Sequence, residues 1–205
     1  SRMEYSIEMI NIPFGSKQEN EMKTAKKKII LVFRKLVSMK DFDKITVAEI
    51  CESAYVSRKT FYTYFKDKND IIEQIFLYSI TQPFREFREL YVTHDLPASL
   101  IMEWLYQRIY EDREFYANVS KFTGQNSLQE LVLKHTTEML DKTLADSCIS
   151  EIDKEYTVYF YAASHTMLLI KWIRDGMIVS PKKMGSYYEK WTIPGWIDIS
   201  QNKET

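Results

Sequence analysis

The segment 57–68 carries side chains whose types suit contact with nucleic acid. It reads Ser-Arg-Lys-Thr-Phe-Tyr-Thr-Tyr-Phe-Lys-Asp-Lys, so that hydroxyls and cations surround aromatic rings. Phe61 and Phe65 are four residues apart and share one face of a helix, where they can anchor a core. Arg58 has the paired N–H groups that recognise the edge of a guanine base. Donors suited to phosphate oxygens are Tyr62, Tyr64 and Lys68, the last because it lies in the first turn of the next helix.

The charge of the surrounding segment agrees with a polyanionic partner. The whole chain of 205 residues has a net charge of −1, but residues 22–68 hold twelve Lys or Arg against five Asp or Glu. The remainder is therefore acidic. A run such as Lys26–Lys35 is by itself most often a solvated helix face, yet beside the segment 57–68 we interpret it as part of a DNA-binding region.

Three helices are predicted to position this segment. Apolar residues recur every three or four positions over 21–40, which indicates an amphipathic helix. Thr46 opens a capping box for a short helix over 46–53, in which its hydroxyl and the carboxylate three residues later satisfy free amides. After a three-residue break, Ser57 is a good N-cap for a second short helix over 57–64. A short helix, a turn and a second short helix, supported by a longer one, form the helix-turn-helix arrangement.

Residues 22–72 resemble, without gaps, the DNA-binding domain of TetR/AcrR-family transcriptional regulators. The resemblance is carried by Thr46-Val-Ala-Glu-Ile, by Val56-Ser57 and by Thr60-Phe-Tyr-Thr-Tyr-Phe-Lys-Asp-Lys-Asn-Asp-Ile-Ile72. It implies a homodimer that binds a palindromic operator in double-stranded DNA, usually as a repressor. A co-activator or an interaction protein without autonomous DNA binding is the alternative. The positions that the resemblance assigns to DNA, mostly to its backbone, are Thr46, Ser57, Arg58, Lys59, Thr60, Tyr62, Tyr64 and Lys68.

Two positions depart from the pattern of that family. Tyr55 stands in the turn where Gly, or another residue that tolerates positive φ, is usual, so we expect a strained backbone there. Lys59 replaces a frequent Gly of the recognition helix and adds a side chain that reshapes base contact. The operator sequence therefore cannot be taken from relatives.

The rest of the chain is also predicted to be helical, which makes the fold class all-α. Gly and Pro together number only 10, too few for a turn-rich β fold. We expect a mobile extension over 1–20, the helix-turn-helix domain over 21–68, a larger dimerisation and ligand-binding domain over 69–191, and a tail over 192–205. Asp67 is predicted to cap a long helix that Pro83 kinks. Further helices are expected over 98–111, 113–122, 127–144 and 153–175, with a last short helix opened by Ser180-Pro181.

Two of these helices are apolar on more than one side, which predicts a partner. For the helices over 127–144 and 153–175, a second copy of the chain would cover the second side in a two-fold four-helix bundle. Residues 160–164, 171–177 and 180–181 resemble a TetR branch that includes dihydroxyacetone-kinase regulators. The small or apolar interface candidates are Ala162, Ala163, Ser164, Thr166 and Leu169.

Aromatic residues between 78 and 172 suit either a tight core or a pocket for a small-molecule effector. Core packing is the simpler interpretation for most of them. The candidates for a pocket are Phe84, Phe87, Tyr91, Trp104, Tyr106, Tyr110, Tyr116, Phe122, Tyr159 and His165.

Nothing in the sequence indicates an enzyme. No nucleophile elbow, phosphate loop, dinucleotide fingerprint or HExxH motif occurs. His94, His135 and His165 lack the spacing of metal ligands, so neither a metal nor a cofactor is predicted. Cys51 and Cys148 suit small buried hydrophobic residues in a reducing cytoplasm. No apolar run is long enough to cross a membrane, and we expect a cytoplasmic regulator.

Overall fold

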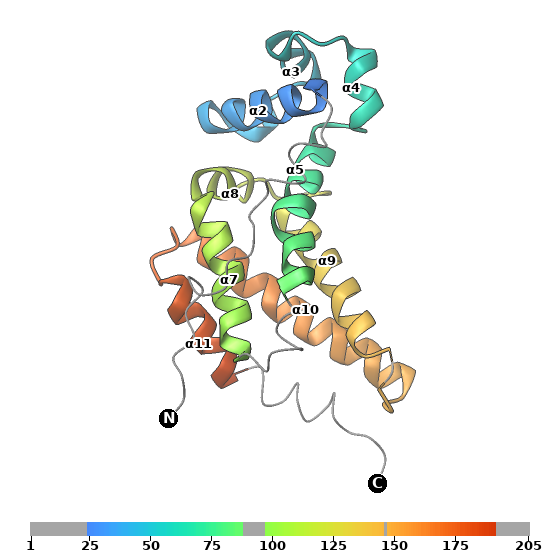
Figure 1. Cartoon of the computed structure of the whole chain (residues 1–205), viewed down its shortest axis with the longest axis vertical. Coiled ribbons are helices and arrows are strands. Elements are labelled where there is room, and N and C mark those ends of the chain that lie inside the picture. Colours follow the sequence, from blue (N-terminus) through green and yellow to red (C-terminus); the bar gives the residue numbers. More distant parts are fainter. Residues whose placement is uncertain (1–23, 88–96, 146, 192–205) are drawn as a thin grey trace.

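The computed structural model describes residues 24–87, 97–145 and 147–191, and within these ranges it is all-α, as predicted (Figure 1). No strand occurs among them, and none of their helices is long and apolar enough to cross a membrane. The predicted extension 1–20 and tail 192–205 lie outside the described residues. The helices are α2 Thr24–Met39, α3 Val47–Ala54, α4 Arg58–Tyr64, α5 Lys68–Phe76, α7 Ala98–Glu111, α8 Arg113–Val119, α9 Leu128–Thr143, α10 Glu151–Arg174 and α11 Pro181–Trp191.

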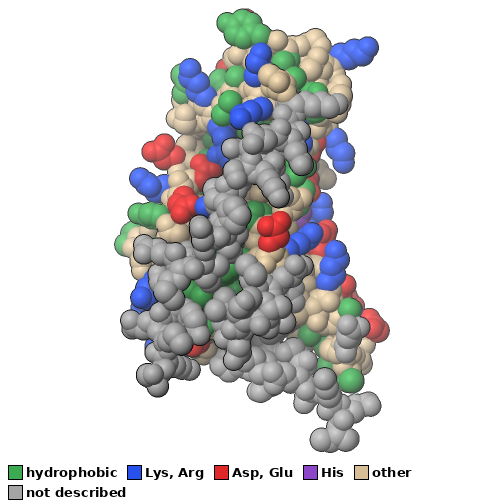
Figure 2. All heavy atoms as spheres, in the orientation of Figure 1, with side chains coloured by type: hydrophobic (Ala, Val, Ile, Leu, Met, Phe, Trp, Pro, Cys, Tyr) green, Lys and Arg blue, Asp and Glu red, His purple; other side chains and the backbone are tan. Residues whose placement is uncertain are grey.

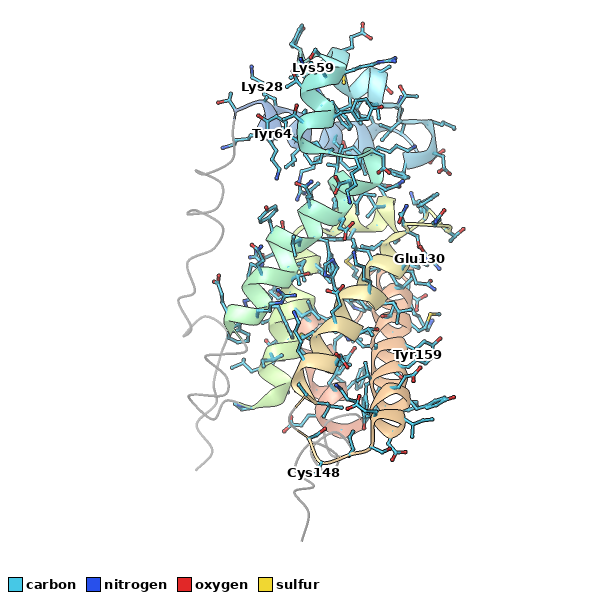
Figure 3. All side chains as sticks on the ribbon, turned by 90° about the vertical axis from the view of Figure 1, so that its right-hand side faces the viewer. Lys28, Lys59, Tyr64, Glu130, Cys148 and Tyr159 are labelled. Carbon is cyan, nitrogen blue, oxygen red and sulfur yellow. The ribbon has the colours of Figure 1, made fainter. Side chains whose placement is uncertain are left out.

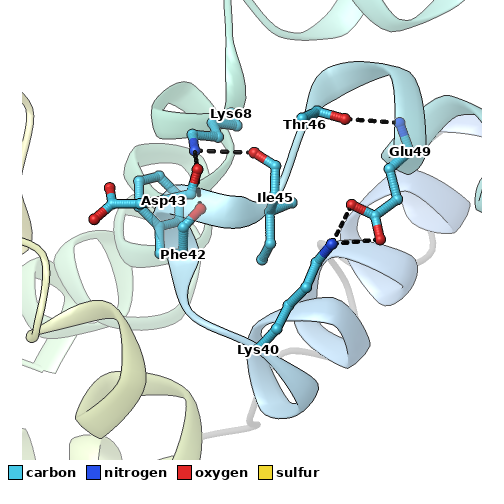
Figure 4. Close-up of polar contacts among 7 residues, drawn as sticks. All are labelled: Lys40, Phe42, Asp43, Ile45, Thr46, Glu49 and Lys68. Atoms are coloured by element: carbon cyan, nitrogen blue, oxygen red, sulfur yellow. Dashed lines mark hydrogen bonds and ion pairs between the residues drawn. The ribbon is translucent and has the colours of Figure 1, made fainter.

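Helices α2, α3 and α4 form a head at one end of the molecule (Figure 1). Its interior holds the apolar face of α2, including the fully buried Phe33, together with Phe61 of α4. The hydroxyl of Thr46 accepts the Glu49 amide at 3.2 Å and that of Ser57 accepts the Thr60 amide at 3.0 Å, so both predicted caps are confirmed. The second half of the capping box is different, because the Glu49 carboxylate binds the Lys40 ammonium at 2.6 Å (Figure 4).

Helix α5 leads from the head into the body of the molecule (Figure 1). Asp67 caps it by accepting two amides, as predicted. The helix then widens into a π-helical turn, η3, over Leu77–Thr81 before helical residues resume at 82–87. Pro83 has no N–H to donate, and the Gln82 amide binds the Leu77 carbonyl five residues back. A local change of helical pitch therefore lies directly before Pro83, the position where the kink was predicted.

Two helix pairs build the body. Helices α9 and α10 run side by side, and α7 packs along α11 on the other side (Figure 1). The second pair approaches closely at Gly185, where a Cβ would lie 2.4 Å from the Ser99 carbonyl oxygen. A side chain at this position would push the two backbones apart, so glycine permits this packing.

Contacts from α2 and α5 hold the head on the body. The Arg34 guanidinium pairs with the Asp112 carboxylate, and it also lies 4.7 Å from the centre of the Phe115 ring. On α5, the Glu73 carboxylate accepts a hydrogen bond from the Lys134 ammonium of α9 at 2.7 Å. These contacts connect α2 to the start of α8, and α5 to α9.

Candidate nucleic-acid interface

Helix α4 presents a polar face to solvent and an aromatic face to the core. Phe61 is 0% exposed, whereas the neighbouring Tyr62 ring is 58% exposed and packs edge-on against it at 5.4 Å between ring centres. Arg58 and Lys59 are exposed at the start of the helix. Within the described part of the chain neither of these two cations has an ion-pair partner. Their charges are thus available to an external anion.

The hydroxyl candidates lie near the same helix end. Ser57 is exposed, and its hydroxyl oxygen lies 2.9 Å from that of the half-buried Thr60. Thr46 is exposed at the start of α3, where its oxygen accepts an amide and leaves its hydroxyl hydrogen to be donated. Tyr64 is half-buried. In Figure 3 Tyr64 and Lys59 lie at the same end of the molecule as Lys28, an exposed cation of α2 that adds positive charge to this end.

Lys68 differs from the other predicted contacts because its ammonium group is already occupied. It donates to the carbonyl oxygens of Phe42 at 2.8 Å, Asp43 at 3.3 Å and Ile45 at 2.9 Å (Figure 4). Burial lowers the pKa of Lys68, and the carboxylates of Asp43 and Asp67 oppose that shift. The side chain joins the start of α5 to the connection before α3. Sequence reasoning missed this role, since no local pattern connects residues 42–45 with residue 68.

Lys68→Ala is therefore expected to lower stability rather than to remove a phosphate contact. Loss of hydrogen bonds from a charged donor should cost about 1–3 kcal/mol in the free energy of unfolding. The slope of log Kd against log salt concentration should stay unchanged, whereas Lys59→Ala should reduce it by about one without loss of stability. Thermal melts and DNA titrations at several salt concentrations measure both. A stable Lys68→Ala variant with a reduced slope would restore the phosphate assignment.

The structure does not bring the ten candidates for an effector pocket into one site. Tyr91 lies outside the described residues. Tyr110 and Tyr159 are at the surface, and Phe122 packs against Phe42 of the head with ring centres 5.1 Å apart. His165 lies 2.6 Å through its Nδ1 from the hydroxyl of Tyr188. The remaining candidates are core side chains, namely Phe84, Phe87, Trp104, Tyr106 and Tyr116.

The interface candidates of α10 divide between its two faces. Ala162, Thr166 and Leu169 are at most 2% exposed within the chain itself, so they serve the core of the monomer and not a partner. Ala163 is half-buried and Ser164 is exposed. Sequence reasoning assigned these three buried residues to the interface because helical periodicity shows two apolar faces without showing which one the same chain covers. The exposed stripe consists of Ile152, Tyr156, Tyr159, Phe160 and Met167.

A polar cleft of about 460 Å³ separates the start of α5 from the start of α9. Its carboxylates are already paired: Asp70 accepts the Lys66 amide, and Glu130 accepts the Asn126 amide at 2.6 Å. Figure 2 shows Lys and Arg side chains over the head and also farther down the molecule, with acidic side chains among the latter. Arg58 and Lys59 of α4 are not among the residues that line this cleft.

Comparison with known proteins gives two family matches. Residues 29–75 match the model described as bacterial regulatory proteins, tetR family. Residues 98–190 match the model described as transcriptional regulator C-terminal region. The first match includes α3, α4 and all but the last residue of α5, and the second runs from the start of α7 to the residue before the end of α11. No curated protein matches the chain significantly.

Solved structures with the same fold share little sequence with the chain. The dihydroxyacetone kinase operon activator DhaS is 20% identical, with a TM-score of 0.55 over 86% of this chain and 97% of its own. A TetR-family regulator from Syntrophomonas wolfei is 15% identical, with a TM-score of 0.59 over 82% and 92%. The fatty acid degradation regulator FadR from Bacillus halodurans is 16% identical, with a TM-score of 0.56 over 83% and 95%.

Proposed function

The chain belongs to the TetR family of transcriptional regulators, and from this we propose that it is a sequence-specific DNA-binding regulator that acts as a homodimer. The observation that carries the proposal is the exposed start of α4, where Arg58 and Lys59 have no ion-pair partner among the described residues. Ser57 and Tyr62 supply hydrogen-bond donors beside them. In a helix-turn-helix protein this end of the second helix enters the major groove, where such donors meet phosphates and base edges.

The exposed apolar stripe of α10 supports the homodimer. Tyr156, Phe160 and Met167 are 71%, 63% and 54% exposed in the single chain. Figure 3 shows Tyr159 pointing away from the helices of its own chain. Pairing α10 with its symmetry mate would bury this stripe, and a two-fold axis matches a palindromic operator. Ala163 and Ser164 lie on the same side of the helix and allow close approach.

We propose repression as the mode of action, relieved or reinforced by a small molecule that binds in the body. Phe76 contacts the rings of Tyr116 and His135, with centres 6.4 Å and 6.0 Å away. The Tyr116 hydroxyl and both His135 nitrogens are buried without a hydrogen-bond partner among the described residues, and the Glu73 carboxylate lies 3.8 Å from His135 Nε2. Buried polar atoms of this kind favour a polar ligand that would satisfy them. DhaS is an operon activator, so activation of transcription is the alternative to repression.

DNA binding by the full chain tests this function. A footprint on the DNA flanking its own gene identifies the operator, and fluorescence anisotropy then compares operator with random duplex. Arg58→Ala is expected to weaken operator binding by about 1–3 kcal/mol and to reduce the preference over random DNA, because it removes a base contact. Lys182→Ala, which removes an exposed cation of α11, is the control. If Arg58→Ala lost affinity for operator and for random duplex equally, Arg58 would not be a base contact.

A further inference from the structure

Tyr55 ends α3 in a conformation that its side chain makes unfavourable. Its φ of 54° and ψ of 45° lie in the left-handed region, which costs a non-glycine residue free energy. The backbone uses this conformation to close the helix: the Tyr55 amide donates to the Glu52 carbonyl at 3.2 Å and the Val56 amide to the Cys51 carbonyl at 3.0 Å. Glycine would make the same bonds without the strain. The expected strain at this turn is therefore present.

The Tyr55 ring is 94% exposed and contributes no burial to the fold. The phenol has no hydrogen-bond partner within the described residues. Glu52 and Ser53, which precede it in α3, are exposed polar residues. A large side chain is thus held at a strained position without stabilising the free chain.

The place of Tyr55 in the head points to DNA. It lies in the turn between α3 and α4, two residues before Ser57 and three before Arg58. In helix-turn-helix docking the first helix crosses the DNA backbone while the start of the second helix enters the groove. The turn that joins these two ends must then lie beside the phosphate strand that borders the groove.

We propose that Tyr55 is an additional DNA contact, in which the ring packs on the deoxyribose of that strand and the hydroxyl donates to a phosphate oxygen. This inference rests on the proposed function. The contact is a neutral hydrogen bond plus apolar packing on the sugar, so it adds affinity without releasing a counterion. A tyrosine at this position therefore lowers the stability of the free head and raises its affinity for DNA.

Tyr55→Gly and Tyr55→Phe in the full chain test this contact. Tyr55→Gly should raise the melting temperature, because the strain disappears, and should weaken binding to operator and random duplex by about tenfold. The slope of log Kd against log salt concentration should remain that of the parent protein. Tyr55→Phe should keep the melting temperature of the parent. Its DNA affinity should decrease by about threefold, because only the hydroxyl contact is lost. Opposite changes in stability and affinity would not arise from a merely structural role.

Three results would overturn the proposal. A Tyr55→Gly variant that binds DNA as tightly as the parent would show that the ring does not contact DNA. A variant that loses melting temperature and affinity together would make the ring a structural element of the head. A parent protein without DNA affinity at low salt would overturn the proposed function as well. The first two results would overturn only the contact by Tyr55, so the two cases are distinguishable.

Discussion

Phe160→Glu is expected to separate the homodimer and to weaken operator binding at least 100-fold. Phe160 lies in the exposed apolar stripe of α10, so a two-fold axis there would bring two glutamates together in an apolar interface. Buried like charges cost several kcal/mol, which the protein avoids by dissociating. A separated protomer engages only one half-site and loses most of the operator affinity. Sedimentation velocity at micromolar concentration and anisotropy on the operator measure the two effects.

Two variants of the same helix control this experiment. Ser164→Glu places the charge one helical turn further along the exposed side and should also yield monomers. Thr166 is 2% exposed inside the chain, so Thr166→Glu should lower the melting temperature instead of producing folded monomers. Folded Phe160→Glu and Ser164→Glu dimers with normal operator affinity would place the interface on another surface.

Acid is expected to destabilise the protein through His165, by about 3 kcal/mol between pH 6.5 and 4. Burial lowers the pKa of His165 from its ordinary 6.5 to about 4. In this range the unfolded chain binds a proton that the folded chain does not, so stability is full above pH 6.5 and falls as the pH decreases. His165 Nδ1 lies 2.6 Å from the Tyr188 hydroxyl, and the Tyr106 hydroxyl lies 3.2 Å from that of Tyr188. In the protonated ring both nitrogens carry a hydrogen, so Tyr188 could only accept from Nδ1 and the charge would be buried.

His165→Gln separates this contribution from other acid effects. Glutamine keeps an amide that can hydrogen-bond to Tyr188 but does not titrate, so the variant should lose less stability than the parent between pH 6.5 and 4. His135 contributes in the same direction, because burial lowers its pKa as well, and it remains present in both proteins. Chemical denaturation at several pH values measures the free energy of unfolding of the parent and of the variant. Parallel stability curves for parent and variant would contradict the assignment to His165.

Local signals determined the elements of the head. The caps at Thr46, Ser57 and Asp67 were predicted because each side chain bonds amides two or three residues ahead, an interaction contained in a short stretch of sequence. The strain at Tyr55 was foreseen from the resemblance, because the family usually has Gly at this turn position. The all-α fold followed from helical periodicity and from the scarcity of turn residues.

Which side chains remain free to act depends on the packing of distant segments. Lys68 has the sequence position of a phosphate contact, but carbonyls 23 to 26 residues away occupy its ammonium group. Helix α10 has two apolar faces, and packing against the rest of the chain covers Ala162 while it leaves Phe160 in solvent. Periodicity reports that a face is apolar, whereas burial depends on which distant segment packs against it. Local sequence patterns therefore predict the helices and their caps, whereas the packing between helices determines which surfaces are left for DNA and for a second copy of the chain.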